Sequence, residues 1–247
     1  MIHSFKTALV TGASSGIGKA VALLLAENGL KVVAVARNEE ALQALASHPN
    51  ILPLSCDVRN HQSIVEFVKA KQLEIDVLVN NAGLLTNRGA FTDITSQDID
   101  DMVEVNLTSV LHLTHALLPE MAQRGRGHLF FTGSSAGLYP HPNSAVYGAT
   151  KAAISMFCDN LRCDLLGTGV RVTEVAPGRV QTQLYRTAIG QEGAQQELYD
   201  GYESIHPEDL AELILHTLKQ PLRVDVSKVA VFPTSQAPGG ARIVKTV

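Results

Sequence analysis

Two side chains near the middle of the chain are spaced for proton transfer. Tyr147 and Lys151 stand one helical turn apart in VYGATK, so on a helix they would lie on the same face. A phenol with its usual pKa of about 10 is a poor base at neutral pH, but a nearby cation lowers that pKa by about one to three units. The pair is therefore a candidate general acid/base. Taken by itself, the same spacing is also common on exposed helix surfaces, and that alternative stays open at this point.

A glycine-rich segment near the start of the chain has the pattern of a phosphate-binding turn. In TALVTGASSGIGKAVA, Gly12, Gly16 and Gly18 follow an apolar run and open an amphipathic stretch. Such a turn lets the backbone approach a pyrophosphate, whose charge is stabilised by free N–H groups at the helix N-terminus. A P-loop is excluded, because Ala20 follows Lys19 where a magnesium-binding hydroxyl would stand. A tight strand-to-helix connection without a ligand is the alternative.

The second apolar run, KVVAVA at 31–36, ends beside a basic residue. In a doubly wound fold, an acid at this strand end binds a free ribose 2′-hydroxyl, whereas an arginine accommodates a 2′-phosphate. Ala36 and Arg37 stand where the acid would be. The sequence therefore predicts NADP(H) rather than NAD(H). An Arg37 that only lies in solvent at a strand end is the alternative.

Short apolar runs alternate with amphipathic stretches along the whole chain. The runs occupy 8–10, 31–36, 51–58, 75–81, 128–134, 170–178 and 228–233. Near-continuous apolar strands separated by helices are typical of parallel strands that are covered on both faces. The prediction is an α/β protein with a doubly wound parallel sheet, a Rossmann fold, as one domain over residues 1–247. The weak apolar periodicity of 183–206 predicts an insertion that borders the substrate.

Charge and hydropathy exclude several classes of partner. The chain carries 20 Lys and Arg against 24 Asp and Glu, a net charge of −4, and no basic block, so nucleic acid is not expected as a partner. Its apolar runs are shorter than the roughly 20 residues that span a bilayer. The opening residues lack the apolar region of a signal peptide, and the three cysteines form no CxxC pair. These features predict a cytoplasmic protein without a membrane partner.

Further motifs follow in a fixed order. The chain contains TGASSGIG at 11–18, NNAG at 80–83, Asn106, Ser134, Tyr147 with Lys151, and PGRVQT at 177–182. Together they resemble the short-chain dehydrogenase/reductase family over essentially the whole chain. The resemblance implies that Ser134 holds the substrate oxygen, Tyr147 transfers the proton, Lys151 lowers the pKa of the phenol and binds ribose, and Asn106 bends its helix and orders a proton relay.

The same resemblance implies a cofactor site. Asp57 and Val58 would frame the adenine, and the segment 177–182 would contact the nicotinamide side. The full implied set is Gly12, Ser14, Ser15, Gly16, Ile17, Gly18, Arg37, Asp57, Val58, Asn80, Ala82, Gly83, Tyr147, Lys151, Pro177, Gly178, Val180 and Thr182.

A narrower resemblance concerns the substrate. GHLFFTGSSAG, VYGATKAAI and VDVSKVAVFPTSQ are similar to NADP-dependent 3-hydroxy-acid dehydrogenases, which act on serine and allo-threonine, and to sulfoacetaldehyde reductases. The implied reaction interconverts a small anionic alcohol, of the 3-hydroxy acid or hydroxysulfonate type, and its aldehyde or ketone. A guanidinium group suits a carboxylate or sulfonate. Arg186 is therefore the preferred candidate for contacting the anion, and Arg179 is the second candidate. The predicted substrate set is completed by Ser134, His141, Gln183 and Tyr185.

Other assignments remain as alternatives. The protein could reduce neutral small carbonyls, act as a non-catalytic NADP-binding sensor, or epimerise or dehydrate a nucleotide sugar, although the short tail after residue 183 argues against the last. The resemblance implies a homo-oligomer, a tetramer or dimer. His112 and His115 are spaced to share a metal, but no carboxylate or cysteine partner stands out nearby, so no metal is expected.

Overall fold

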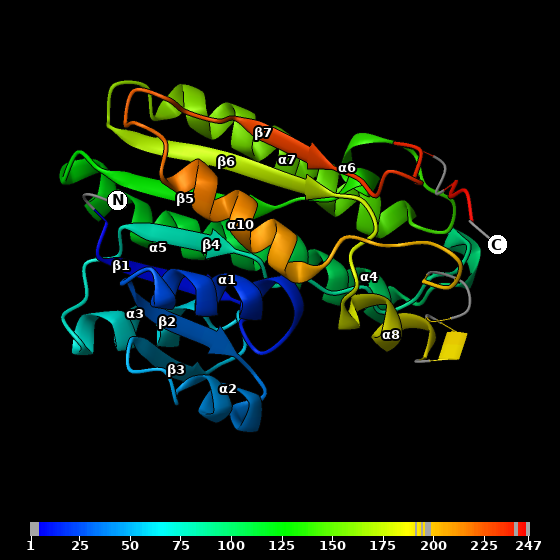
Figure 1. The fold of residues 1–247 in the computed structure, drawn as a ribbon, viewed down its shortest axis with the longest axis horizontal. Coiled ribbons are helices and arrows are strands. Elements are labelled where there is room, and N and C mark those ends of the chain that lie inside the picture. The colour runs from blue at the N-terminus through cyan, green and yellow to red at the C-terminus, as the bar shows by residue number, and fades with distance from the viewer. Residues whose placement is uncertain (1–4, 191, 194, 196–198, 240–241, 246–247) are drawn as a thin grey trace.

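A parallel sheet forms the centre of the molecule. The computed structural model describes residues 5–190, 192–193, 195, 199–239 and 242–245. Within these residues the sheet has seven strands in the order β3-β2-β1-β4-β5-β6-β7 (Figure 1). They are β1 (Thr7–Thr11), β2 (Lys31–Ala36), β3 (Ile51–Ser55), β4 (Val77–Asn80), β5 (Gly127–Thr132), β6 (Val170–Pro177) and β7 (Lys228–Val231). The predicted doubly wound parallel sheet is confirmed.

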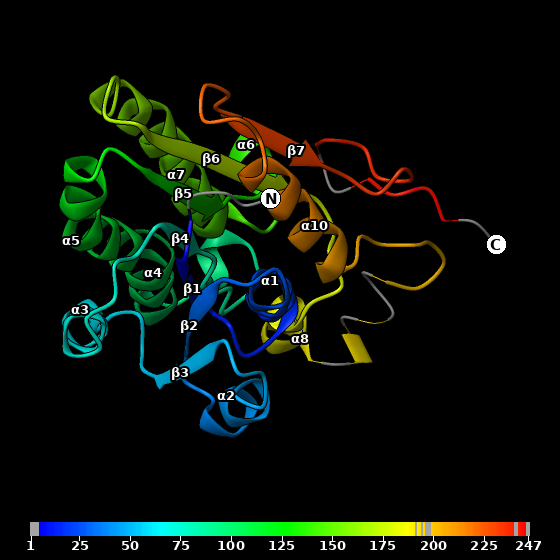
Figure 2. The ribbon, with the colours of Figure 1, turned by 60° about the vertical axis from the view of Figure 1, so that its left-hand side comes forward.

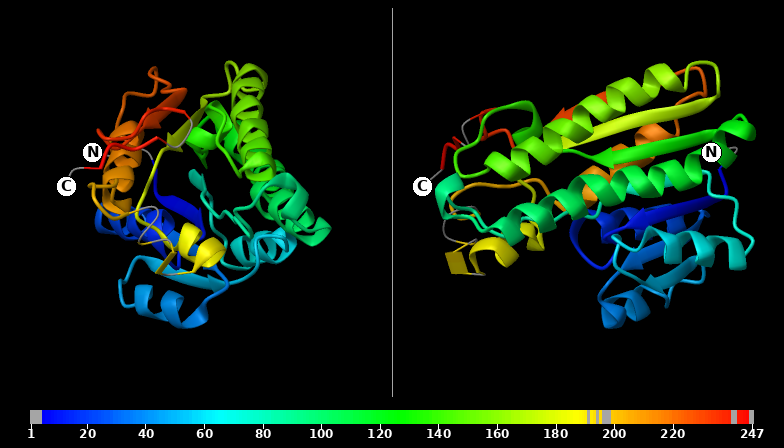
Figure 3. Two further views of the ribbon diagram at one scale, coloured as in Figure 1. Left: turned by 90° about the vertical axis from the view of Figure 1, so that its right-hand side faces the viewer. Right: turned by 180° about the vertical axis from the view of Figure 1, so that it is seen from behind.

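Helices cover both faces of this sheet (Figure 2). One face carries α1 (Gly16–Glu27), α2 (Glu39–Leu45) and α10 (Pro207–Leu218). The other carries α3 (His61–Ala70), α4 (Ser96–Val103), α5 (Ser109–Gln123) and α7 (Ala145–Asp164). Two short helices, α6 (Ser135–Leu138) and α8 (Gln183–Ile189), follow the carboxyl ends of β5 and β6 (Figure 3). Every helix in the described part of the chain is too short or too polar to cross a bilayer.

The two covered faces explain why the strands read as continuous apolar runs. Successive side chains of a strand point to opposite faces. In β1, Ala8 and Val10 pack in one hydrophobic cluster with α1 and α10, whereas Leu9 packs in a second cluster with α5 and α7. All residues of β1 are buried. Both faces therefore require apolar side chains, and no polar alternation appears in the sequence.

The segment predicted as an insertion, 183–206, packs back onto the end of β6. Val180 and Ile205 form an isolated parallel bridge that closes its base. Tyr199 is buried, and its hydroxyl donates to the Val180 carbonyl oxygen at 3.1 Å. The segment begins with α8, while residues 191, 194 and 196–198 lie outside the described part. These contacts hold α8 beside the carboxyl end of the sheet.

A histidine of β5 is fully buried in the sheet. His128 of β5 is 0% exposed, and its Nε2 lies 2.8 Å from Thr173 Oγ1. Its ring stacks on Phe130 with 4.0 Å between the ring centroids. Burial, reinforced by the positive charge of Arg171, holds the pKa of His128 well below its usual value. The imidazole is therefore neutral in the folded protein.

We predict that His128 makes the protein less stable in mild acid. The unfolded chain binds a proton here with a pKa of about 6.5 and the folded chain does not, so stability falls as the pH drops below about 6.5, by up to roughly 1.4 kcal/mol per pH unit. His128→Gln removes this contribution. Thermal unfolding between about pH 7.5 and about pH 5 should show a smaller loss of Tm in the variant than in the unmodified protein. His115→Gln, at an exposed position, is the control, and equal pH dependence in all three proteins would contradict the prediction.

Candidate active site

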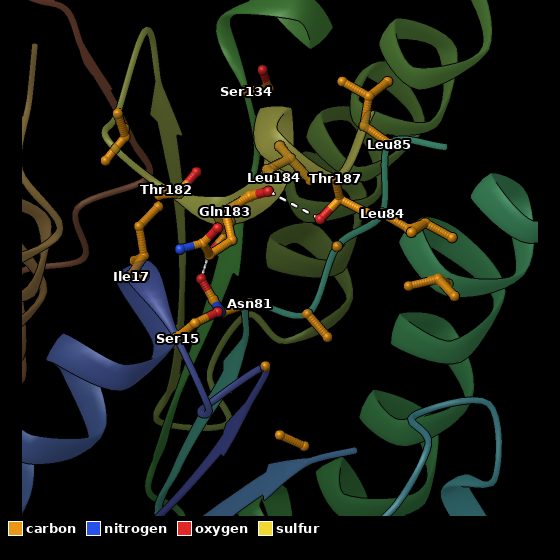
Figure 4. A pocket seen from close by; sticks show the side chains of 18 of the residues that line it. Ser15, Ile17, Asn81, Leu84, Leu85, Ser134, Thr182, Gln183, Leu184 and Thr187 are labelled. Atoms are coloured by element: carbon orange, nitrogen blue, oxygen red, sulfur yellow. Dashed lines mark hydrogen bonds between the residues drawn. The ribbon is translucent and has the colours of Figure 1, made fainter. Parts of the chain in front are cut away.

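A cleft of about 310 Å³ opens at the carboxyl ends of the strands. It lies where the strand order reverses, between β1 and β4, which is where doubly wound sheets bind ligands. Figure 4 shows that three segments far apart in sequence meet there: the glycine turn with Ser15 and Ile17, the segment after β4 with Asn81 to Leu85, and the start of α8 with Thr182 to Leu184.

Most of the predicted cofactor residues line this cleft. They are Gly12, Ser14, Ser15, Gly16, Ile17, Arg37, Asp57, Val58, Ala82, Gly83, Tyr147, Lys151, Pro177, Gly178, Val180 and Thr182. Gly18 and Asn80 are not among the lining residues, and each has a different position that the structure explains.

Gly18 is a packing residue beneath the turn. A Cβ added to Gly18 would overlap the Gly12 carbonyl oxygen and lie 2.5 Å from Nδ2 of Asn81. Gly12 itself has a φ of +67°, in the left-handed region that favours glycine. Only glycine lets α1 start this close to the end of β1, because the side of Gly18 faces protein, and its contact with a cofactor stays a prediction.

Asn81, rather than the predicted Asn80, reaches the cleft. Asn80 is buried in β4, and its Nδ2 donates to Thr114 Oγ1 at 3.0 Å. The Asn81 Nδ2 donates to the Thr11 carbonyl oxygen at 3.0 Å, and the Asn81 Oδ1 accepts from Thr132 Oγ1 at 3.3 Å. Neighbouring residues at a strand end point to opposite sides, which gives the two amides different surroundings. Asn81 thereby ties together the ends of β1, β4 and β5.

The far side of the cleft is basic. Arg37 is exposed at the end of β2 and lines the cleft, with Asp57 and Val58 beside it. Arg59 holds Asp57 through Nη2 to Oδ2 at 2.8 Å and Nε to Oδ1 at 3.1 Å. This hydrogen bonding, together with the charge of Arg37, lowers the pKa of Asp57. The Asp57 carboxylate is thus ionised and fixed, while Arg37 faces the cleft.

These residues fit a dinucleotide with a 2′-phosphate. The turn has no room for side chains, since a Cβ on Gly12 would lie 2.9 Å from Asn81 Nδ2. Ser15, at the N-cap of α1, makes no side-chain capping bond, so its side chain does not occupy the N–H groups of the first turn. Such groups could hold a pyrophosphate, and Arg37 could hold the additional phosphate.

On the β5 side of the cleft, three of the four predicted catalytic side chains come together. Tyr147 and Lys151 of α7 are 6% and 4% exposed, and the Lys151 Nζ lies 5.8 Å from the centre of the Tyr147 ring. Ser134 follows β5 and hydrogen bonds to the Tyr147 hydroxyl. The Lys151 Nζ donates to the Thr132 carbonyl oxygen at 2.7 Å. The expected same-face geometry is present, and all three side chains line the cleft.

Burial shifts the pKa values of both the phenol and the lysine. Burial raises the pKa of Tyr147, with the nearby Tyr185 adding to the effect, and the hydrogen bond from Ser134 only partly offsets it. Burial likewise lowers the pKa of Lys151 to about 8, although the charge of Glu174 acts in the opposite direction. Removal from water is thus the largest influence on the Tyr147 pKa in this structure, and a lowering of that pKa by Lys151 stays a prediction.

Asn106 lies behind the cleft rather than in its wall. It is 1% exposed in a π-helical turn, Glu104–Thr108, between α4 and α5, which agrees with the expected helix irregularity. Its Oδ1 accepts from the Leu84 N–H at 2.7 Å, and its Nδ2 donates to the Leu84 carbonyl oxygen at 2.8 Å and to Thr150 Oγ1 at 3.3 Å. The amide therefore fixes the segment after β4 against α7.

The predicted substrate residues divide into three groups. Ser134, Gln183 and Tyr185 line the cleft. His141 and Arg179 line a separate small cavity beside it. Arg186, the preferred anion contact, lines neither cavity, and its Nε is buried without a hydrogen-bond partner among the described residues.

Several lining residues were not predicted. They are Ala36, Cys56, Leu84, Leu85, Val105, Thr132, Gly133, Leu184 and Thr187, whereas Asn81 belongs to the NNAG motif that the family resemblance places along the cofactor. Most of these side chains carry no reactive group, so only their closeness to a motif marks them in the sequence. His112, one of the two histidines whose spacing could share a metal, stacks on His61 with 4.8 Å between the ring centroids. No group of three or more metal-ligating side chains occurs among the residues that the structure describes.

Comparison with known proteins agrees with this site. The short chain dehydrogenase family matches residues 6–193. An uncharacterised short-chain type dehydrogenase/reductase of Sinorhizobium fredii is 52% identical, over 99% of this chain and 98% of its own. Sulfoacetaldehyde reductase 2 of Chromohalobacter salexigens is 39% identical, over 93% and 94%. An NADP-dependent 3-hydroxy acid dehydrogenase of Salmonella typhi is 37% identical, over 95% and 98%.

A solved structure is similar along nearly the whole chain. The closed form of a serine dehydrogenase complexed with NADP+ matches with a TM-score of 0.90 and 34% identity, and it covers 94% of this chain and 96% of its own. The sequence relatives and the solved structure thus agree over nearly the whole chain. The chain therefore belongs to the short-chain dehydrogenase/reductase family, as its motifs predicted.

Proposed function

We propose that the protein is an NADP(H)-dependent oxidoreductase that interconverts a small anionic alcohol, of the 3-hydroxy acid or hydroxysulfonate type, and its aldehyde or ketone. The observation that carries the proposal is a single cleft with Tyr147, Ser134 and Lys151 on its β5 side and Arg37 on its β2 side. Relatives named for NADP, for 3-hydroxy acids and for sulfoacetaldehyde support it.

The cofactor would be held by the glycine turn, by Arg37 and by Lys151. NADP(H), when bound, supplies the hydride acceptor or donor. The chain contributes binding and charge: the backbone around Gly12 accepts phosphates without steric conflict, Arg37 matches a 2′-phosphate, and the Lys151 ammonium offers hydrogen bonds to ribose hydroxyls.

The proton moves through Tyr147. Ser134 Oγ holds the oxygen of the substrate, and the Tyr147 hydroxyl gives its proton to that oxygen as the carbonyl carbon is reduced; oxidation of the alcohol reverses both movements. Because burial raises the pKa of Tyr147, the phenol keeps its proton before the reaction. The protonated phenol is the form that donates in reduction, and the phenolate is the form that accepts the proton in oxidation.

A buried carboxylate lies behind the catalytic lysine. Glu174 of β6 is 0% exposed, and its Oε2 accepts from Ser155 Oγ at 2.9 Å and lies 3.1 Å from Lys228 Nζ. Its Oε1 lies so close to Gly133 that a Cβ there would overlap it. Its negative charge raises the pKa of Lys151 against the effect of burial. We assign Glu174 the role of keeping Lys151 protonated. Asn106 is a positioning residue, because its amide fixes the segment after β4 against α7.

A second candidate substrate class has support in the cleft itself. Leu84, Leu85, Val105 and Leu184 give the cleft apolar walls. Such walls suit a neutral aldehyde or ketone as well as the carbon chain of an anion. Neutral carbonyls therefore belong in every assay as the alternative class. Assembly as a homo-oligomer and cytoplasmic location stay predictions.

Tyr147→Phe should lower NADPH-dependent turnover of small aldehydes by roughly 10²–10⁴-fold, because the general acid is lost. NADPH binding, followed by fluorescence titration, should persist. Tyr139→Phe, in an exposed tyrosine of the preceding loop, is the control and should keep full activity. Undiminished turnover in Tyr147→Phe would refute the assignment. Cofactor binding without turnover by the unmodified protein, across anionic and neutral carbonyls, would favour the sensor alternative.

Arg37→Ser should weaken NADPH binding by about 10–100-fold, the loss expected for a charge-assisted hydrogen bond, and leave NADH binding nearly unchanged. Dissociation constants for the two cofactors measure the effect. Lys31→Ser, an exposed residue at the other end of the same strand, should change neither constant. An equal loss for NADPH and NADH would show that Arg37 does not contact the 2′-phosphate.

Glu174→Gln should move the alkaline limb of the pH profile of kcat/KM to lower pH, by about half a unit to one unit. The reason is that removing the negative charge lowers the Lys151 pKa further below its value of about 8. Glutamine retains the hydrogen bonds to Ser155. Asp159→Asn removes the other carboxylate near Lys228 and should leave the limb in place. An unmoved limb in Glu174→Gln would contradict the electrostatic role.

A further inference from the structure

A small polar cavity adjoins the cleft on the substrate side. Its volume is about 10 Å³, and it shares Tyr147 and Tyr185 with the wall of the cleft. Its remaining walls include Arg88, His141 and Arg179. A volume of this size holds about one water-sized sphere. The cavity therefore matches one oxygen atom of a substrate whose reacting group lies at Tyr147, and not a whole second ligand.

Arg179 is a buried cation with an unused donor. The residue is 5% exposed, and its backbone N–H donates to Gln236 Oε1 at 2.7 Å. Its guanidinium carbon lies 4.7 Å from the centre of the Tyr185 ring, and it also hydrogen bonds to Tyr202. Nη1 is buried and has no hydrogen-bond partner among the described residues. A buried charged donor left unpaired is costly, so a ligand anion at Nη1 would remove a penalty.

His141 presents a second unused polar atom to the same space. Its Nε2 is buried and has no hydrogen-bond partner in the described part of the chain. Burial lowers the pKa of His141, and the charges of Arg179 and Arg88 lower it further, so the ring is neutral at neutral pH. Both arginines line the same cavity as His141. A neutral imidazole can donate one N–H to an anion.

The charged side chains that line the cavity are all positive. The residues that line it include Arg88 and Arg179 and no carboxylate. The carboxylate in the wall of the main cleft, Asp57, is at the β2 side and is paired with Arg59. An anion next to Tyr147 would therefore meet donors and positive charge, without a competing acidic group in the cavity wall.

We propose that Arg179, assisted by His141, is the receptor for the carboxylate or sulfonate of the substrate. The inference rests on the proposed function for the identity of the reacting group and names the residue that recognises the anion. Because the cavity wall includes Tyr147, the anion lies only a few bonds from the reacting oxygen, as in a 3-hydroxy acid or a 2-hydroxysulfonate. Arg186, which lines neither cavity, does not contribute.

Binding of anionic alcohols tests the proposal without requiring turnover. Titration calorimetry with 3-hydroxypropionate, 2-hydroxyethanesulfonate and the neutral 1,3-propanediol compares the unmodified protein with Arg179→Gln and Arg186→Gln. We expect the unmodified protein and Arg186→Gln to prefer the anions. Arg179→Gln should bind them at least about tenfold more weakly, and the diol equally well. Arg179→Lys should recover part of the loss, because it restores the charge without the planar fork.

Each other outcome overturns the proposal. It fails if the unmodified protein binds the anions no more tightly than the diol, or if Arg179→Gln binds the anions as tightly as the unmodified protein does. It also fails if Arg186→Gln, rather than Arg179→Gln, loses anion binding. Circular dichroism shows whether Arg179→Gln folds, and His141→Asn replaces it if it does not. His141→Asn should weaken anion binding several-fold and leave diol binding unchanged. Unchanged anion binding in His141→Asn counts against the proposal.

A turnover assay separates this proposal from the proposed function. With NADPH, Arg179→Gln should raise KM for anionic aldehydes and leave kcat/KM for neutral aldehydes unchanged. If the unmodified protein binds the anions through Arg179 but reduces no aldehyde, the proposed function fails and the anion receptor stands. If it reduces aldehydes but shows no dependence on Arg179, the receptor fails and the proposed function stands.

Discussion

The packing of α1 against the end of β1 sets the position of everything in the cleft. It depends on the absence of a side chain at Gly18, where a Cβ would overlap the Gly12 carbonyl oxygen. Thr11 completes the arrangement, since its hydroxyl accepts from the N–H groups of Asn81 and Ala82 at 3.0 Å each. The ends of β1 and β4 are thereby fixed to each other. Phosphate groups and the reacting atoms can occupy one cleft only because this edge of the sheet is rigid.

Burial governs the chemistry on the other side of the cleft. The same removal from water raises the pKa of Tyr147 and lowers that of Lys151, so it acts against the charged form of each group. Glu174, itself shielded from solvent, opposes the effect on Lys151. Arg179 shows the same physics in the small cavity beside the cleft, as a buried cation whose Nη1 has no hydrogen-bond partner among the described residues. Burial of these ionisable groups costs electrostatic free energy, and ligand binding and proton transfer would recover part of that cost.

The fold was predictable because its signals are local and repeated. Each strand is buried on both faces, so a continuous apolar run marks it, as in β1 and β2. Tyr147 and Lys151 were predictable as a pair because helical geometry alone places them on one face. The candidate substrate residues were harder to predict. Arg186 and Arg179 have the same chemistry, but only Arg179 lines a cavity beside Tyr147. Side-chain direction on a short helix such as α8 depends on what it packs against.

By itself, the sequence determined the parallel α/β sheet, the glycine turn, the basic residue at the end of β2 and the spacing of the proton-transfer pair, because each follows from local periodicity or from a side chain's own chemistry. Only the tertiary structure decided that Asn81 rather than Asn80 joins the strand ends, and that Asn106 lies behind the cleft. It also decided that burial raises the Tyr147 pKa by more than the hydrogen bond from Ser134 lowers it. These outcomes depend on contacts between residues distant in sequence and on the exclusion of water, neither of which a local pattern contains.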